Sequence, residues 1–263
     1  MSSCKIATLY SGSSGNCTLI SSHNTSILID AGGSARAICS ALENVGSDIR
    51  DISAIFITHE HTDHISALCG ISKKYSIPIH ITDISAQKPA SMGELSLDKC
   101  LCRHNTVFCQ MVGDIKVTSF PTPHDSMMSV GYRIEIGSGD KHYTIGVATD
   151  IGHVTPQIRE GLLGCCAVVL ESNHDQDMLR NGPYPQFLKK RILSPKGHLS
   201  NEDSAELSSY LAKNGTRAFI LAHLSRENNL PELAYDVHVS SISDSSVTVC
   251  VAKPDCPVEL LLS

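Results

Sequence analysis

Short apolar and β-branched runs, separated by turn-forming residues, recur along most of the chain. Residues 54–57 (Ala-Ile-Phe-Ile) and 167–170 (Ala-Val-Val-Leu) are continuous apolar runs, which are typical of buried strands. Other runs are shorter or more mixed but rich in strand-forming residues. The predicted strands cover residues 5–10, 17–22, 26–30, 54–57, 106–111, 115–120, 130–136, 142–149, 167–171, 217–222 and 246–252.

Stretches with apolar residues at helical spacing lie between these strands. Two strand-rich halves with interspersed helices predict an α+β fold in which two sheets pack face to face, with helices outside. No linker, repeat or break in composition divides the chain, so we expect residues 1–263 to form a single domain. The predicted helices cover residues 34–44, 65–75, 156–163, 186–192 and 201–213.

Composition limits the location and the partners that we expect. The 263 residues carry a formal net charge of −6, so there is no overall basic field for nucleic acid. No stretch reaches the ~18–20 apolar residues of a membrane span, and residues 1–6 lack the features of a signal peptide. We therefore expect a cytoplasmic protein without contact to a membrane, whose 11 cysteines are reduced and form no structural disulfides.

A dense group of ligand-type side chains follows the first of the two apolar runs. The pattern His-x-His-x-Asp-His places His59, His61, Asp63 and His64 within six residues, just before a predicted helix. In an extended turn, residues at positions i and i+2 project to the same side, so His59 and His61 face together. Asp63 and His64, in the first helical turn, can point at an adjacent position. The spacing therefore predicts two metal ions rather than one.

Three later strands are each followed by one more ligand-type residue: His124, Asp150 and His223. Loops at strand ends commonly carry active-site groups. Imidazole and carboxylate together favour borderline divalent ions, zinc first, with manganese or iron as alternatives. We assign one ion to His59, His61 and His124, and the other to Asp63, His64 and His223, with Asp150 as the bridge.

The charges of such a centre favour an anionic substrate. Two divalent ions bring four positive charges, whereas two aspartates and a shared hydroxide remove three. Paired ions lie ~3.5–4 Å apart and act on the attacking and leaving oxygens of a displacement. Because zinc-bound water can reach a pKa near 7, we expect a metal-bridging hydroxide to be the nucleophile.

The ordered ligand set resembles that of the metallo-β-lactamase superfamily over nearly the whole chain. This resemblance implies a four-layer αββα sandwich with a dinuclear site at one edge. The flanking segments look like the bacterial YycJ/WalJ branch, which is related to the phosphodiesterase and nuclease side of the superfamily. They read SGSSGN at 11–16, LIDAG at 28–32, PTPHD at 121–125, ATDIGH at 148–153, ESNHD at 171–175, GHLS at 197–200 and LAHLSREN at 221–228.

Two residues outside the ligand set carry the expectation of phosphodiester cleavage. In the similar ribonuclease Z group, a Glu and a His at places comparable to Glu171 and His198 form a pair whose His protonates the leaving oxygen. A phosphodiester expels a poor alkoxide, so a general acid is needed, typically worth ~10²–10⁴-fold. We predict His198 as the general acid, oriented by Glu171, and we count Asp63 as a catalytic residue as well as a ligand. Asp30 is a candidate partner for a ligand imidazole.

Candidate contacts to the substrate lie on both sides of the site. Residues 188–197 hold four basic side chains and no acidic one, and they run directly into His198. We predict that Lys196 contacts phosphate, although such a run can also be a solvated helix face. In the loop 11–16, Ser13 and Asn16 are predicted to bind substrate, although this loop can equally be a plain turn.

The resemblance favours a metal-dependent nuclease that acts on DNA in a 5′–3′ exonuclease mode. Alternatives are a hydrolase of small cyclic phosphodiesters, thioesters or lactams, and a metal-bound regulatory or scaffold protein with weak residual turnover. Only residues 151–222 separate Asp150 from His223, so we expect no β-CASP insertion. The exact substrate, the native metal and the oligomeric state stay open at this point.

Overall fold

The computed structural model describes residues 4–138 and 141–262 and contains two seven-stranded sheets. The first sheet combines the six strands of the N-terminal half with one strand from the C-terminal end of the chain. Its strand order is β14 (Val258–Leu262), β1 (Cys4–Tyr10), β2 (Cys17–Ser21), β3 (Ser26–Ile29), β4 (Ile52–Phe56), β5 (Ile79–Thr82) and β6 (Leu101–His104).

The second sheet is built from consecutive strands of the second half. Its order is β13 (Thr248–Val251), β12 (Ala218–Ala222), β11 (Ala167–Glu171), β10 (Lys141–Ala148), β9 (Ser129–Ser138), β8 (Ile115–Thr122) and β7 (Cys109–Val112). Each sheet has three antiparallel pairs on one side and three parallel pairs on the other: the pairs from β14 to β3 and from β10 to β7 are antiparallel, and those from β3 to β6 and from β13 to β10 are parallel.

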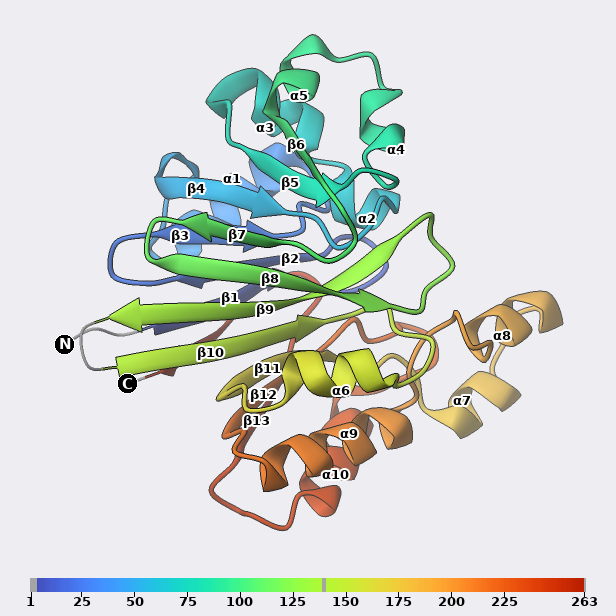
Figure 1. Ribbon diagram of the computed structural model, residues 1–263. Helices are drawn as coiled ribbons and strands as arrows, with labels where there is room; N and C mark the ends of the chain where they lie inside the picture. The colour runs from blue at the N-terminus through green and yellow to red at the C-terminus, as the bar shows by residue number, and fades with distance from the viewer. Residues whose placement is uncertain (1–3, 139–140, 263) are drawn as a thin grey trace.

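Helices cover the outer face of each sheet, which gives four layers (Figure 1). Buried side chains form one core between the sheets and one core under each helical layer, as expected for this architecture. The predicted αββα sandwich is therefore confirmed. The first layer contains α1 (Ala35–Asn44), α3 (Leu68–Tyr75), α4 (Gln87–Ala90) and α5 (Leu95–Cys100), and the second contains α6 (Pro156–Leu162), α9 (Asn201–Lys213) and α10 (Pro231–Ser241).

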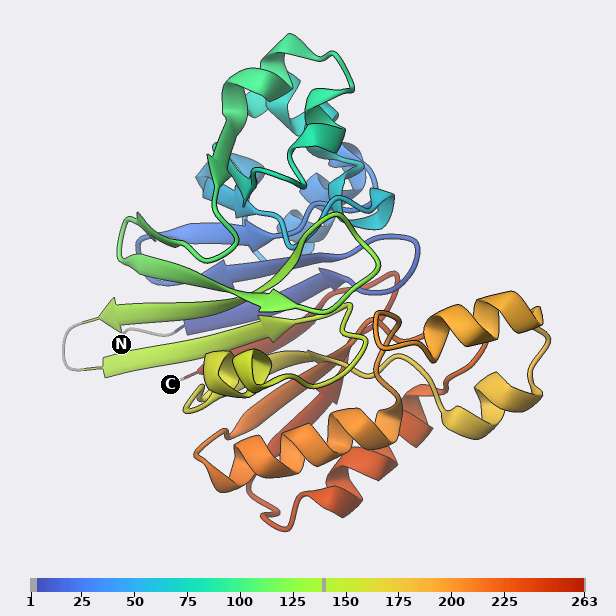
Figure 2. The ribbon, with the colours of Figure 1, turned by 45° about the vertical axis from the view of Figure 1, so that its right-hand side comes forward.

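Two short helices leave the sandwich and form an arm. They are α7 (Gln176–Asn181) and α8 (Gln186–Ile192), and they extend sideways from the body in both views (Figures 1 and 2). Nζ of Lys189 in α8 donates a 2.7 Å hydrogen bond to the carbonyl oxygen of Arg180 in α7, so the two helices are tied to each other. We call residues 176–192 the α7–α8 arm.

The predicted elements differ from the observed ones at several places. The predicted helix 65–75 is two helices, α2 (Thr62–Ile65) and α3, because the amide of Ala67 donates to the carbonyl oxygen of Ala31 and so interrupts the helical pattern. The predicted strand 106–111 starts later, as β7, because the amide of Phe108 donates to the side chain of Ser119. The strand predicted at 246–252 is β13 and is not the last, because β14 follows and pairs with β1.

Other predicted elements differ only in their bounds, and the following elements had no prediction: β5, β6, β14, α4, α5, α7, α10 and the 3-10 turn Ile49–Asp51. Within the described parts of the chain, none of the helices combines the length and the apolar character that crossing a membrane requires.

Candidate metal centre

The ligand-type residues of both halves meet at one edge of the sandwich, where strands end. Their donor atoms form four overlapping groups in which all atoms lie within 4.8 Å of one another. The groups are His59, His61 and His124; Asp63, His64 and His223; His59, His64 and Asp150; and Asp150, Glu171, His198 and His223. The structure thus brings together all seven predicted ligands.

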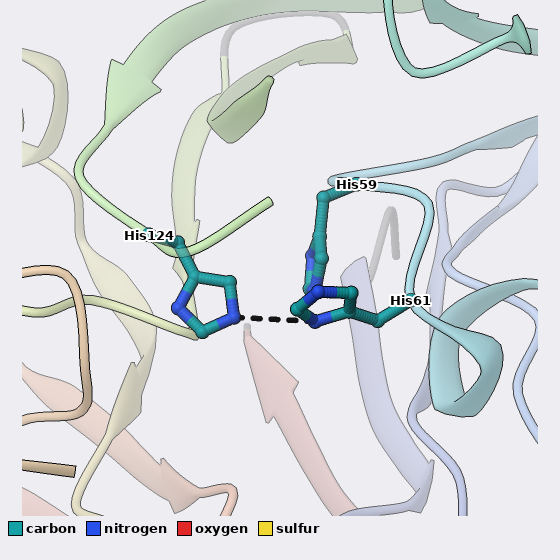
Figure 3. Close-up of side chains that lie close together, drawn as sticks. All are labelled: His59, His61 and His124. Carbon is teal, nitrogen blue, oxygen red and sulfur yellow. Dashed lines mark hydrogen bonds between the residues drawn. The ribbon is translucent and has the colours of Figure 1, made fainter. Parts of the chain in front are cut away.

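The first group joins the loop after β4 to the loop after β8. The rings of His59, His61 and His124 point toward one another (Figure 3). Nε2 of His124 lies 3.3 Å from Nδ1 of His61, and the ring centroids of His59 and His124 are 4.9 Å apart. Three imidazoles that converge in this way form a typical zinc-type donor set.

Asp150 lies between this group and the second one. Its Oδ2 is 3.3 Å from Nε2 of His64, and its Oδ1 is 3.5 Å from Nε2 of His223 and 3.8 Å from Nε2 of His124. Asp63 completes the second group, with Oδ2 3.5 Å from Nε2 of His64. The carboxylate of Asp150 thus lies near histidines of both groups, which is the placement that a bridging ligand requires.

The outer ring nitrogens of the histidines are fixed by hydrogen bonds. Nδ1 of His64 lies 2.8 Å from Oδ2 of Asp30, and Nδ1 of His59 lies 3.1 Å from Oγ1 of Thr58, which itself donates to Asp30. The role predicted for Asp30 is therefore confirmed. Such partners fix the orientation of a ligand imidazole and increase its basicity.

Glu171 plays the same part for the other half of the centre. Its Oε1 lies 2.9 Å from Nδ1 of His223 and 2.8 Å from Nδ1 of His198, and Oε2 accepts hydrogen bonds from the amides of Ile151 and Leu199. The predicted pairing of Glu171 with His198 is thus present in the structure. Its contact with His223 has no signal in the sequence, because the two residues are 52 positions apart.

Three potential metal-binding atoms of the centre have no hydrogen-bond partner among the described residues. Nε2 of His59, Oδ2 of Asp150 and Nε2 of His223 are buried and have no hydrogen-bond partner in the described parts of the chain. Buried polar atoms are almost always paired, so three unpaired donors facing one space call for a bound group. Imidazole nitrogens and a carboxylate fit a divalent cation.

Electrostatics agree with a site for cations. Burial lowers the pKa of His64, but Asp30 and Asp150 outweigh burial and raise this pKa well above its ordinary value. Burial also lowers the pKa of His223, but Asp150, Asp63 and Glu171 raise it to about 10. The carboxylates therefore stabilise positive charge on the two imidazoles, and bound cations would satisfy the same carboxylates.

The backbone is unusual at the same places. Asp30, Asp150 and His223 have φ of 62°, 57° and 59°, in the left-handed region that disfavours side chains other than Gly, Asn and Asp. Each is the first or second residue after its strand, where the left-handed turn aims the side chain across the sheet edge. Strained residues of this kind cluster at functional sites, and the sequence pattern contained no signal for them.

The loops that carry the ligands are interlocked. The amide of Asn16 donates to the carbonyl oxygen of Asp63, and the amide of Gly32 donates to the carbonyl oxygen of Asn16. A Cβ at Gly32 would lie only 1.8 Å from the carbonyl oxygen of Asp63, so this close approach requires glycine. The segments SGSSGN (11–16) and LIDAG (28–32) therefore hold the loop that carries Asp63 in place.

The predicted substrate contacts have different outcomes. Ser13 lines a cleft of about 160 Å³ beside His198 and His223. Asn16 is buried, and its side chain bonds to Gly12 and lies 3.1 Å from Nε2 of His64, so it supports the ligands instead of lining the cleft. Lys196 is exposed and does not line this cleft.

Two of the four basic side chains in residues 188–197 already have partners within the protein. Arg191 pairs with Asp125, the residue after His124, so the run has an acidic partner that is distant in the sequence. Lys189 is buried and holds the α7–α8 arm together. Only Lys190 and Lys196 extend from the run as exposed side chains without an ion pair in the described residues.

Glu60 is a further site residue that the sequence reading passed over. It is buried, and it accepts hydrogen bonds from the amide of Met127 and from Oγ of Ser85. Glu60 therefore joins the loop that carries His59 and His61 to the loop that carries His124. Its position between two ligand histidines was the available signal.

Comparisons with known proteins identify the family of this chain. Residues 10–89 match the model of the metallo-β-lactamase superfamily. The exodeoxyribonuclease WalJ of Streptococcus pneumoniae is 35% identical over 251 residues, covering 94% of this chain and 91% of the relative. The exodeoxyribonuclease YycJ of Bacillus anthracis is 34% identical over 227 residues, covering 86% of this chain and 84% of the relative.

Among solved structures, the metallo-β-lactamase fold protein YhfI from Bacillus subtilis is similar with a TM-score of 0.73 and 15% identity, covering 99% of this chain and 100% of YhfI. This likeness concerns the fold. The identity to the two curated relatives extends over most of each chain. The protein therefore belongs to the WalJ/YycJ family of the metallo-β-lactamase superfamily.

Proposed function

We propose that the chain is a metal-dependent phosphodiesterase, namely an exodeoxyribonuclease that acts on DNA with 5′–3′ polarity. The observation that carries this proposal is the Glu171–His198 pair beside the ligand set, at the wall of the cleft. A thioester expels a thiolate, which is a better leaving group than the alkoxide of a phosphodiester, so its hydrolysis has less need of such an acid. The exodeoxyribonuclease names of the two curated relatives support the choice of DNA.

The proposed cofactor is a pair of zinc ions, with manganese or iron as alternatives. His59, His61 and His124 would hold one ion; Asp63, His64 and His223 would hold the other; Asp150 would bridge them. When bound, such a pair polarises the phosphodiester and activates a water molecule for attack on phosphorus. We also propose that residues 1–263 form one domain without a β-CASP insertion. Two observations support this: both halves of the chain supply ligands to one centre, and β14 from the C-terminal end belongs to the first sheet.

The protein's own residues would handle the leaving group. Oε1 of Glu171 accepts the hydrogen bond from Nδ1 of His198, so Nε2 of His198 is the nitrogen left to face a substrate in the cleft. As the oxygen of water bonds to phosphorus, the bond to the leaving oxygen breaks, and His198 transfers its proton to that oxygen. The phosphate stays on one product, and the other product leaves with a hydroxyl group.

The test is a substrate panel with His198→Ala. End-labelled single- and double-stranded DNA and RNA are compared with a chromogenic phosphodiester and a chromogenic cephalosporin. We expect release of nucleotides from DNA, and a loss of about 10²–10⁴-fold in His198→Ala with metal content unchanged. Exposed His23, in the hairpin at the opposite end of the sheet, provides the control variant His23→Ala.

Two results would contradict the proposal. Turnover of the cephalosporin without cleavage of any phosphodiester would show that the substrate class is wrong. Loss of metal from His198→Ala, measured by elemental analysis, would show that His198 is a ligand instead of an acid.

A further inference from the structure

The cleft beside His198 has one wall that the proposed reaction does not use. This wall belongs to the α7–α8 arm and consists of Tyr184, Leu188 and Ile192, with Arg191 at its edge. Ser13, Asp125, Asn173 and Ser225 also line this cleft. The arm therefore presents an aromatic ring and two aliphatic side chains to whatever lies next to the general acid.

The segment that carries Tyr184 is held in place. Tyr184 lies between Pro183 and Pro185, which restrict the backbone on both sides. A Cβ on Gly182 would lie 2.5 Å from the carbonyl oxygen of Met178, so the turn packs tightly against α7. Arg191 links α8 to Asp125, which lies in the loop that carries His124. The ring thus belongs to a preorganised wall.

The charges of the wall favour a neutral group over a phosphate. Arg191 is paired with Asp125, and Lys189 donates to Arg180 inside the arm, so neither offers a free cation to the cleft. The volume of about 160 Å³ is below the ~300–1,000 Å³ of sites for drug-sized ligands. A single ring system fits these limits in size and in charge.

The position of His198 identifies the part of the substrate that would bind in this cleft. The general acid gives its proton to the leaving oxygen, so the group in the cleft beside it is the nucleoside on the leaving side of the scissile bond. Aromatic side chains stack on bases of any sequence. We propose that Tyr184 and Leu188 form a subsite for one unstacked nucleobase, that of the nucleoside which departs with a hydroxyl group; this inference rests on the proposed function.

The subsite has a consequence for substrate choice. A base can enter it only after leaving its own stack and its pairing partner, which costs free energy in a duplex and little in a single strand. Unpaired ends should therefore be cleaved faster than paired ends of the same sequence, and the identity of the base should matter little.

The experiment uses the metal-loaded protein and short single-stranded oligodeoxynucleotides with a tetrahydrofuran abasic residue on one or the other side of the terminal scissile bond. Mass spectrometry identifies the product without the phosphate, and kcat/KM is measured for the first cleavage. In the wild type, removing the base on that side should lower kcat/KM by about 5- to 150-fold, the effect of one lost stacking contact. Removing the base on the other side should not have this effect.

Variants of Tyr184 test whether this dependence of kcat/KM on the base is due to the α7–α8 arm. Tyr184→Ala should lower kcat/KM for intact DNA by a similar factor and should no longer respond to removal of the base, whereas Tyr184→Phe should retain the response. Phe187→Ala is the control, because Phe187 is 75% exposed in α8, three residues after Tyr184, and does not line the cleft. Elemental analysis and circular dichroism establish that each variant is loaded and folded.

Distinct results refute the two proposals. If DNA is cleaved but the rate does not depend on the base, or if Tyr184→Ala keeps the full response, the subsite is wrong while the proposed function stands. If the wild type cleaves none of the oligonucleotides, the proposed function fails, and the subsite fails with it.

Discussion

Asp30 supports the ligands from a position that costs backbone strain. Its carboxylate contacts His64 and Thr58, and through Thr58 it also acts on His59, so one buried side chain orients ligands of both histidine groups. Its φ of 62° is tolerated by Asp and Asn better than by other residues with a side chain. Asn at this place keeps the turn and removes the charge.

We therefore expect Asp30→Asn to weaken metal binding by about 10–100-fold, the range found for partners of ligand histidines. Competition with a chromogenic chelator measures the affinity. Asp51→Asn changes an exposed aspartate and should leave affinity unchanged. Equal affinity in Asp30→Asn and the wild type would mean that this carboxylate does not act on the centre.

Single residues divide clearly into those that the sequence could indicate and those that it could not. His59, His61, Asp63 and His64 stand out because local spacing alone places them together. The contact of Glu171 with His223 and the pairing of Arg191 with Asp125 depend on how distant loops meet. Local sequence patterns do not indicate such contacts, and they do not indicate the left-handed backbone at Asp30, Asp150 and His223 either.

At the level of elements, a stack of four rings crosses the first sheet near its edge. Phe56, His80, His104 and Phe108 lie face to face, with centroid distances of 4.6, 5.1 and 4.1 Å. Nδ1 of His80 is 2.9 Å from Nε2 of His104. Burial and the neighbouring His104 lower the pKa of His80 to about 4, and burial lowers the pKa of His104.

This stack should make the fold sensitive to acid. Between pH 6.5 and about 4, the unfolded chain binds a proton at His80 while the folded chain does not, so the free energy of unfolding falls as the pH falls. We expect His80→Phe to lose less of this free energy than the wild type in urea titrations at pH 7 and pH 4.5.

The same substitution at exposed His142, on β10, is the control and should leave the pH dependence as in the wild type. An identical dependence in His80→Phe and the wild type would contradict the role given to the stack.

Elements with strong periodicity were predictable and short ones were not. Strand β11 and helices α8 and α9 match their predicted bounds, because apolar runs and a Ser cap at Ser200 are local signals. Strand β5 has four residues, all buried, and one of them is His80, so no apolar run announces it. The strand β14 is half exposed and gains its place only by pairing with β1.

For the whole molecule, the metal centre is a link between the two sheets. His59, His61, Asp63 and His64 follow strands of the first sheet, whereas His124, Asp150 and His223 follow strands of the second. Without bound cations, buried carboxylates and imidazoles from both sheets face each other. Metal binding should therefore stabilise the sandwich as well as supply the chemistry.

Removal of metal by a chelator should lower the melting temperature, and added metal should restore it. One site filled at 100 times its Kd adds about 2.7 kcal/mol, or roughly 5–10 °C in a chain of this size. Differential scanning calorimetry at a series of free metal concentrations measures the shift. Asp150→Asn keeps the left-handed turn and should reduce the shift; an unreduced shift would argue against Asp150 as a bridge.

Because β14 belongs to the first sheet, this sheet can be completed only after the last strand of the chain has been synthesised. The partner of β1 on one side, β2, is synthesised directly after it, but its partner on the other side, residues 258–262, is synthesised at the end of the chain. Through all of that time, Cys4–Tyr10 presents an open strand edge, the kind of surface on which nascent chains stick to one another. The N-terminal half of this protein is thus completed last, and a nascent chain that stalls late in translation is a candidate client for chaperones.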